Sequence, residues 1–210
     1  MEEPKKDIPD LRRGEFGIRY MPTFSSLALR TYNGDVVDGQ LTMSQGYGVM
    51  MAFNFDRHIG VQGEINYYQT SQKYKDRGLE RQVDVSYINI PLMLSVNTDK
   101  RLPVNLNFVA GPQFGINVGS SIKTIGGANA DTLKATVAVK QGDVGFAYGT
   151  GLEIALNRAH TCRIDLGFRG FYGFVDMSAT NTSNNPDTYN ILVKASRKTY
   201  AGYLGLTICF

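Results

Sequence analysis

Residues 196–210 read Ser-Arg-Lys-Thr-Tyr-Ala-Gly-Tyr-Leu-Gly-Leu-Thr-Ile-Cys-Phe and end the sequence. From Tyr200 onward, every second residue is a large apolar residue or glycine, and the residues between them are mostly small or polar. A period of two predicts a β-strand with one apolar face. A free edge on such a strand invites aggregation, whereas a barrel has no edge because its last strand pairs with its first. The stretch therefore predicts the closing strand of a β-barrel.

The same alternation recurs in seven earlier segments. They span approximately residues 15–29, 41–55, 59–69, 82–96, 103–118, 143–156 and 162–173. In 82–96 the apolar residues change parity at Tyr87, which predicts a β-bulge there. The connections alternate long and short along the chain, so the long loops gather at one end and the short turns at the other. The pattern predicts an all-β fold, an eight-stranded antiparallel up-and-down transmembrane β-barrel.

Composition narrows the function classes. The chain has 210 residues and a net charge of +3, so nothing indicates a nucleic-acid partner. It contains no run of 18 apolar residues, but barrel strands need only about 9–11 residues each. The two cysteines lack metal-ligand spacing, and we expect neither a metal nor a cofactor. The charged residues 1–13 predict a flexible periplasmic leader, and residues 14–210 predict the barrel.

The two faces of the strands decide between a membrane barrel and a soluble one. Most strands carry several large apolar residues on one face, too many to fill the interior of an eight-stranded barrel. The other face carries glycine, alanine, serine, asparagine, threonine and a few charges, which fits an interior. We therefore expect the apolar face to meet lipid. A soluble, lipocalin-like binding protein is the alternative, and dependence on detergent would distinguish the two.

Several segments resemble a known family. The terminal strand, with its last aromatic residue, resembles the C-terminal strand of bacterial outer-membrane barrels. Tyr-Ile-Asn-Ile-Pro-Leu-Met-Leu-Ser-Val at 87–96, Val-Ala-Gly-Pro-Gln-Phe-Gly at 109–115 and Gly-Thr-Gly-Leu-Glu at 149–153 resemble the PorT-like, OmpX-like outer-membrane barrels of Bacteroidetes. The resemblance implies a Gram-negative cell envelope, with extracellular loops and both termini in the periplasm. One member is linked to the type IX secretion system, and most are of unknown role.

An enzymatic role is the second class to weigh. Lipid A-modifying barrels need a serine, a histidine and a carboxylate at the outer leaflet. The two histidines, His58 and His160, fall in short turns at the opposite end. We therefore expect no catalytic residues. The prediction is a non-enzymatic protein that acts through its loops and wall, in adhesion or stabilisation or as an accessory subunit of a larger outer-membrane complex; the alternative is a lipid A-modifying enzyme.

Charged residues on the polar face predict a plug inside the barrel. Glu153 should face Asp165 across the last short turn, with Arg163 and Arg169 placed diagonally. Arg19 and Glu64 reach in from the far wall. Buried charge is unfavourable unless it is paired, so this set should close the interior.

Three further expectations concern the basic residues of a loop, a glycosylation site and the two cysteines. In the second loop, Lys73, Lys75, Arg77 and Arg81 would pair with lipopolysaccharide phosphates, or else form a solvated charged loop. Asp131-Thr132-Leu133 resembles the O-glycosylation tripeptide of Bacteroidetes, with Thr132 as acceptor. Cys162 should face lipid and Cys209 the interior, so both thiols should be free.

Overall fold

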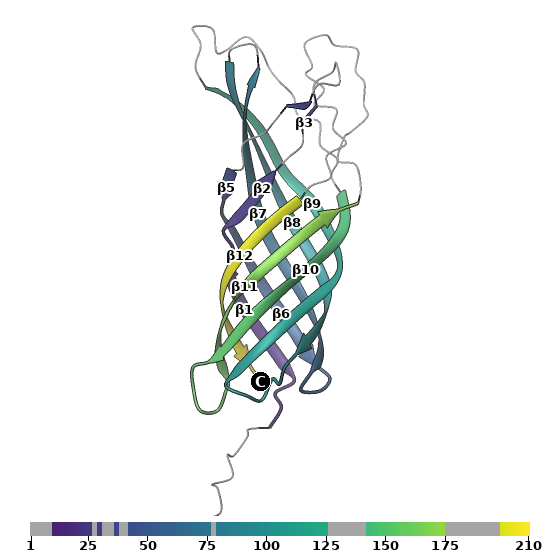
Figure 1. The fold of residues 1–210 in the computed structure, drawn as a ribbon, viewed down its shortest axis with the longest axis vertical. Coiled ribbons are helices and arrows are strands. Elements are labelled where there is room, and N and C mark those ends of the chain that lie inside the picture. Colours follow the sequence, from purple (N-terminus) through teal and green to yellow (C-terminus); the bar gives the residue numbers. More distant parts are fainter. Residues whose placement is uncertain are drawn as a thin grey trace, which may run out of the picture.

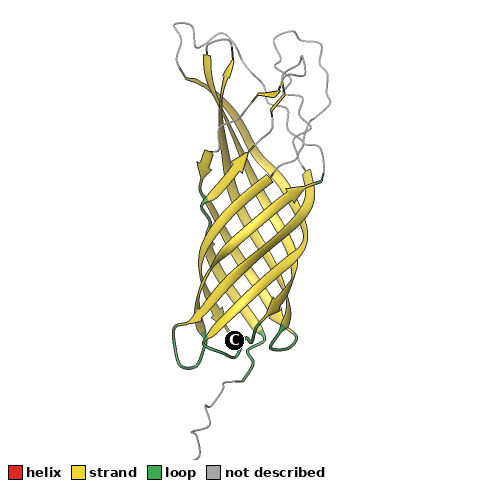
Figure 2. Ribbon diagram, viewed as in Figure 1, coloured by secondary structure: helices red, strands yellow, loops and turns green. Residues whose placement is uncertain are grey.

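The computed structural model describes residues 10–26, 29–30, 36–37, 42–76, 79–125, 142–174 and 198–210, and these form strands, turns and no helix (Figure 2). Accordingly, the described residues include no helix long and apolar enough to cross a membrane. One sheet closes on itself as a barrel (Figure 1). Its segments are β1 (Gly14–Tyr20), β2 (Thr23–Ser26), β5 (Thr42–Ser44), β6 (Gly46–Asn54), β7 (Ile59–Asp76), β8 (Leu79–Asn97), β9 (Val104–Ile125), β10 (Gly142–Ala155), β11 (Cys162–Gly173) and β12 (Lys198–Cys209).

These ten segments make eight barrel strands, because β2 continues β1 and β5 leads into β6. The closure predicted from the last strand is confirmed. β12 pairs antiparallel with β11 and with β1, in a register that sets Glu15 opposite Cys209 and Tyr20 opposite Leu204. Every other neighbour in the barrel sheet is also antiparallel. The eight-stranded antiparallel barrel is therefore confirmed.

Pro22 explains the break between β1 and β2. Proline has no N–H to donate to a ladder, so it interrupts a strand. The neighbouring groups remain bonded: the Met21 N–H donates to the Gly46 carbonyl at 2.8 Å, and the Gly202 N–H donates to the Pro22 carbonyl at 3.1 Å. The seam between first and last strands is thus continuous across the break.

Three strands are longer than the sequence pattern predicted. β7 runs to Asp76, β8 begins at Leu79 and β9 runs to Ile125, so most of the predicted loop 70–81 is strand. The prediction was wrong because polar residues there do not alternate in hydropathy, yet the backbone still pairs, for example Tyr74 with Arg81. The three strands project beyond the barrel at one end (Figure 1), which we call the loop end. The small sheet of β3 (Leu29–Arg30) and β4 (Val36–Val37) also lies there.

The bulge predicted near Tyr87 is present, but the extra residue belongs to β9. Ser86 pairs with Gly119 and Tyr87 pairs with Asn117, so Val118 has no partner on β8. Tyr87 points into the barrel and is buried.

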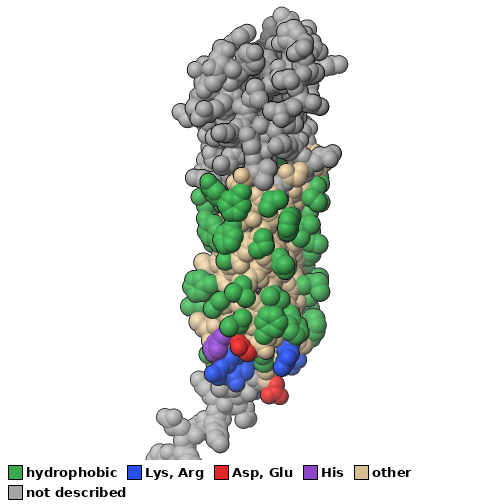
Figure 3. Space-filling view, turned by 90° about the vertical axis from the view of Figure 1, so that its right-hand side faces the viewer, with side chains coloured by type: hydrophobic (Ala, Val, Ile, Leu, Met, Phe, Trp, Pro, Cys, Tyr) green, Lys and Arg blue, Asp and Glu red, His purple; other side chains and the backbone are tan. Residues whose placement is uncertain are grey.

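The two faces are distributed as predicted. Large apolar side chains such as Ile18, Met51, Leu92, Phe108 and Leu206 are exposed on the outside of the barrel. On the face shown in Figure 3, hydrophobic side chains cover the wall, and the charged side chains among the described residues gather at the end opposite the loop end. That end, which carries the short turns 55–58, 98–103 and 156–161 and the C-terminus, is called the turn end.

Candidate functional site

The interior holds two separate layers of charge. The layer nearer the loop end consists of Arg19 on β1, Glu64 on β7, and Asp165 and Arg169 on β11. The Arg19 guanidinium donates to both carboxylates, Glu64 and Asp165. Arg169 Nη2 and Nε donate to Glu64 Oε1 at 3.0 and 3.2 Å. Arg19 therefore bridges the two acids, and Arg169 supports only one of them.

Tyr203 of β12 completes this layer. Its ring lies 4.5 Å from the Arg19 guanidinium carbon and 4.7 Å from that of Arg169, measured to the ring centroid. Its hydroxyl donates to Asp165 Oδ1 at 3.1 Å. Glycines opposite make room for the ring, since a Cβ at Gly151 or Gly167 would stand 2.2 or 2.6 Å from Tyr203 atoms. The cations are thus held by both carboxylate and aromatic contacts.

The second layer lies at the turn end and is organised by Lys100. This lysine belongs to the turn between β8 and β9, and its side chain folds back into the barrel. Its Nζ lies 2.9 Å from Glu15 and 2.7 Å from Glu153. Asn54 Nδ2 donates to Glu15 at 2.6 Å. Arg163 donates to the Lys100 carbonyl, so its guanidinium fixes the backbone of the same turn.

Each layer contains two cations and two carboxylates, and each is therefore neutral. Buried ion pairs are tolerated when geometry and additional hydrogen bonds compensate for the loss of hydration. In the turn-end layer Arg163 Nη1 stands 3.8 Å from Glu153 Oε2, a looser contact than the lysine pairs. The two layers place fixed, paired charges in the interior at two levels along the barrel.

All six predicted interior charges lie inside the barrel, but as two groups and not one plug. Glu153 pairs in register with Asp165 as expected, and Arg169 forms its ion pair with Glu64. Sequence reasoning missed Glu15 and Lys100. Glu15 has inward parity on its strand. The described strands bury five carboxylates but only three arginines, and this excess could have indicated a further cation such as Lys100; the carboxylates are Glu15, Glu64, Asp84, Glu153 and Asp165.

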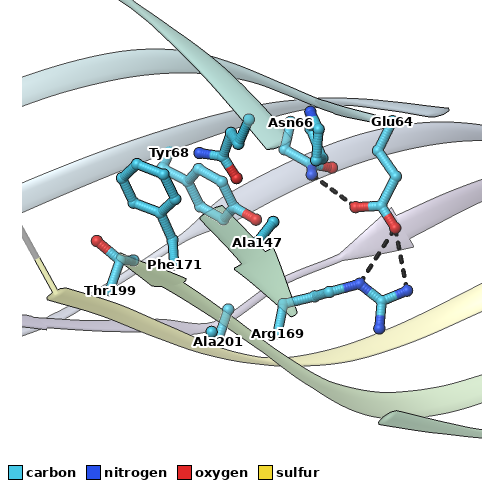
Figure 4. Close-up of a pocket in the computed structure, with 11 residues that line it drawn as sticks. Glu64, Asn66, Tyr68, Ala147, Arg169, Phe171, Thr199 and Ala201 are labelled. Atoms are coloured by element: carbon cyan, nitrogen blue, oxygen red, sulfur yellow. Dashed lines mark hydrogen bonds and ion pairs between the residues drawn. The ribbon is translucent and has the colours of Figure 1, made fainter. Parts of the chain in front are cut away.

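A small cavity lies above the first layer, toward the loop end (Figure 4). Its volume is about 10 Å³, enough for about one water. The Glu64–Arg169 pair forms one side, and Tyr68 and Phe171 stand near each other across from it. Three buried polar atoms lining it have no hydrogen-bond partner among the described residues: Asn66 Oδ1, Gln113 Nε2 and Thr199 Oγ1. Polar atoms of this kind are normally satisfied by ordered water.

Both histidines lie in the short turns at the turn end. His58 Nδ1 lies 3.2 Å from the Asn97 carbonyl, and His160 Nδ1 lies 2.8 Å from the Arg101 carbonyl. Both rings thus tie neighbouring turns together. Within the described ranges, no group of histidine, cysteine, aspartate or glutamate side chains could hold a metal ion.

Carboxylates in the same turns have lowered pKa values. The Asp56 carboxylate accepts the backbone N–H groups of His58 and Ile59, and these hydrogen bonds hold its pKa below the ordinary 3.8. The Asp99 carboxylate accepts hydrogen bonds from the side chain and backbone of Arg101, which lower its pKa likewise. Both aspartates are therefore charged at neutral pH.

The two cysteines are free in the structure and have opposite parities. Cys209 is buried in the barrel beside the turn-end layer, whereas Cys162 pairs with the outward Ile208 and is half-buried. The basic residues of the predicted second loop fall on strand backbone at Lys73, Lys75 and Arg81, and Arg77 lies outside the described residues. Thr132 also lies outside them.

The sequence of residues 23–179, well over half of the chain, matches the family described as outer membrane protein beta-barrel domain. The chain belongs to this family. Solved structures with the same fold include the outer membrane protein OprG from Pseudomonas aeruginosa, with a TM-score of 0.62 and 13% identity over 97% of this chain and 99% of that one. The attachment invasion locus protein Ail of Yersinia pestis gives 0.50 and 14% over 96% and 100%.

Neisserial surface protein A gives a TM-score of 0.51 with 14% identity over 94% of this chain and 97% of that one. At these identities the likeness establishes the fold. A search of curated protein sequences finds no match. Family membership identifies this outer-membrane barrel domain as a component of the bacterial outer membrane. The resemblance to PorT-like barrels of Bacteroidetes remains an interpretation of the sequence.

Proposed function

We propose that this protein is a non-enzymatic, non-conducting outer-membrane barrel that acts through its loop end and its wall. The observation that supports the proposal is the presence of two buried charge layers in the interior: Arg19, Glu64, Asp165 and Arg169, and Glu15, Lys100, Glu153 and Arg163. A barrel closed in this way offers a substrate no route through its centre. Its useful surfaces are then the outside of the wall and the projecting strands β7, β8 and β9.

Bilayer recordings test the closed interior. The protein reconstituted in planar bilayers should show no stable single-channel steps, because fixed charges occupy the cross-section at two levels. A variant that replaces both Lys100 and Glu153 by alanine should still be closed by the other layer. Stable, large conductance steps from the wild-type protein would contradict the proposal.

The loop end is proposed to be extracellular, with both termini in the periplasm. The long projecting strands at one end and the short turns at the other support this orientation, since outer-membrane barrels have short periplasmic turns. Cysteine introduced at Gln72 should react with an impermeant maleimide on intact cells, and cysteine introduced at Arg158 should react only after the outer membrane is opened. The reverse pattern would overturn the orientation.

The basic residues of the projecting hairpin are proposed to bind lipopolysaccharide phosphates. Lys73, Lys75 and Arg81 belong to the β7–β8 extension, and Arg77 falls between the two strands in the sequence. Four basic residues thus occur within nine positions of the chain. The variant K73Q/K75Q/R77Q/R81Q should bind lipopolysaccharide vesicles more weakly while folding normally. Unchanged binding would leave the hairpin a solvated surface and refute this role.

The proposal also includes protein partners. In adhesion, in stabilisation of the envelope or as an accessory subunit of a larger outer-membrane complex, this barrel would contact its partner through the loop end or the wall. Cross-linking in native membranes through a photoreactive residue at Gln72, compared with one at the lipid-facing Leu92, would distinguish a loop-end partner from a wall partner. Deacylation or acyl transfer on purified lipid A by the protein would instead favour an enzyme.

A further inference from the structure

Arginines are spaced around the whole rim of the turn end. The strands meet there at four junctions: the turns β6–β7, β8–β9 and β10–β11, and the closure of β12 on β1. Each junction carries at least one arginine. One from each junction forms the arginine ring, and Arg12 adjoins Arg13 at the fourth; the ring consists of Arg57, Arg101, Arg158 and Arg13. Because the junctions fall at every second strand of a closed eight-stranded sheet, the ring surrounds the barrel.

The acidic and amide residues of the same turns are engaged in local contacts. Asp56 caps the first turn, accepting N–H groups at 2.6 and 2.8 Å, and Asn157 Oδ1 accepts the Thr161 N–H at 2.8 Å. Asp99 forms a two-point pair with Arg101. The other three ring arginines are exposed and have no ion pair among the described residues. The remaining charged or titratable groups nearby are Asp10, Arg12, His58 and His160.

An apolar rim adjoins the ring at every junction. Its members are Phe55, Leu102, Leu156 and Phe210, all exposed, with Phe210 the most exposed at 66%. Phe55 and Leu156 lie two residues before the arginine of their turn, and Leu102 follows Arg101 directly. Phe210 is bonded through its backbone to Gly14, next to Arg13. The guanidinium groups thus begin where the lipid-facing wall ends.

We infer that the arginine ring binds the phosphates of anionic phospholipids in the leaflet at the turn end. Guanidinium forms two parallel hydrogen bonds to a phosphate, and an anionic leaflet attracts basic residues close to its surface. A soluble anion would gain nothing from the adjacent apolar rim, whereas a phospholipid brings acyl chains to the wall and a phosphate to the arginines together. The inference requires insertion in a membrane and goes beyond the proposed role of the loop end.

Quenching by brominated lipids tests the ring at its own depth. The chain has no tryptophan, so a single one can be introduced as Phe55→Trp beside the ring or as Phe146→Trp toward the loop end. Each variant is reconstituted in phosphatidylcholine vesicles that contain brominated phosphatidylglycerol or brominated phosphatidylcholine. At Phe55→Trp the anionic lipid should be preferred at least about twofold. The preference should weaken with added salt.

Two equal changes of charge provide the control. R13Q/R57Q/R158Q should abolish the preference at Phe55→Trp, whereas K73Q/K75Q/R81Q, which removes three charges from the loop end, should leave it intact. Phe146→Trp should report no change caused by R13Q/R57Q/R158Q. A preference that is absent, or that survives R13Q/R57Q/R158Q, overturns the inference. Absence of quenching by either lipid at both positions would overturn insertion itself, and with it the ring.

Discussion

Glu153 and Asp165 are direct cross-strand partners on β10 and β11, yet their carboxylates serve different charge layers. Glu153 accepts hydrogen bonds from Lys100 at the turn end, and Asp165 accepts one from Arg19 toward the loop end. Two like charges placed opposite each other in a sheet repel one another. Each carboxylate has its own cation, which offsets this repulsion and makes each layer dependent on one bridging cation.

Lys100 is the bridging cation of the turn-end layer. Lys100→Met should destabilise the barrel by about 3–5 kcal/mol, because Glu15 loses its cation and Glu153 keeps only the looser contact with Arg163. The adjacent Arg101→Met removes a partly exposed pair with Asp99 and should have a much smaller effect on stability. Urea unfolding in lipid vesicles measures both. Equal effects of the two substitutions would contradict the role of Lys100 as bridging cation.

Arg19 plays the same part in the other layer. Arg19→Met should cost about 3–5 kcal/mol, since Asp165 then has no ion pair left among the described residues, while Arg169→Met should cost less because Glu64 keeps Arg19. Adding Asp165→Asn to Arg19→Met should recover part of the loss by removing the stranded charge. Heat-modifiable migration on gels reports the folded fraction. If the double variant were no more stable than Arg19→Met, the coupling would be wrong.

The fold could be predicted because each strand of a membrane barrel alternates apolar, lipid-facing residues with small or polar, inward-facing ones. The alternation around Leu204, Leu206 and Ile208 fixes which residues face outward, and the spacing of turn residues fixes the order of strands. The extension of β7, β8 and β9 could not be predicted this way. Beyond the membrane no lipid imposes apolar alternation, so paired strands such as 70–76 read as polar loop.

The charge layers were only partly predictable for a related reason. Parity places Arg19, Glu64 and Asp165 in the interior, but the height at which side chains meet depends on strand tilt and on long, flexible side chains. Lys100 belongs to a turn, where parity has no meaning, and only the backbone path of that turn directs it inward. A count of unmatched inward carboxylates was the one available signal.

Acid should weaken the turns at the turn end. The pKa values of Asp56 and Asp99 are lowered in the folded state, so their contribution to stability is fully present above about pH 4 and is lost as pH falls through the folded values. The D56N/D99N variant should therefore show a shallower loss of unfolding free energy on acidification than the wild-type protein. Urea midpoints measured at a series of acidic pH values test this. Parallel pH profiles would refute it.

The two thiols should remain separate and differ in reactivity. Cys162 and Cys209 point to opposite sides of the sheet, and Cβ vectors that diverge cannot be bridged without moving the backbone. In the folded protein Cys162 should react with maleimide faster than the buried Cys209, and both should react after unfolding. Mass spectrometry gives the count of labels. An intramolecular disulfide in the native protein would contradict the assigned faces.

Neighbouring residues of β12 should respond in opposite ways to charge and to bulk. Leu206 is 42% exposed on the wall, so Leu206→Arg puts a charge on the lipid face and should cost about 2–4 kcal/mol near mid-bilayer, whereas Leu206→Phe should be tolerated. Gly205 faces the interior, where an added Cβ would stand 2.9 Å from Arg19 Cγ and 3.0 Å from the Ile18 carbonyl oxygen. Gly205→Val must therefore displace the side chain that bridges the loop-end layer, although valine is apolar.

Substitutions at adjacent residues of β12 lie at nearly the same depth but on opposite faces of the strand, so comparing them isolates the effect of the face. Thr207 is buried in the interior, and Thr207→Val keeps its size and should be nearly neutral, because its hydroxyl has no partner among the described residues. The expected order of folded fraction is Leu206→Phe and Thr207→Val near wild type, with Leu206→Arg and Gly205→Val well below. Heat-modifiable migration after refolding into vesicles gives this order directly. Harmless charge at Leu206 together with accepted bulk at Gly205 would reverse the two faces, and a barrel with reversed faces could not lie in lipid.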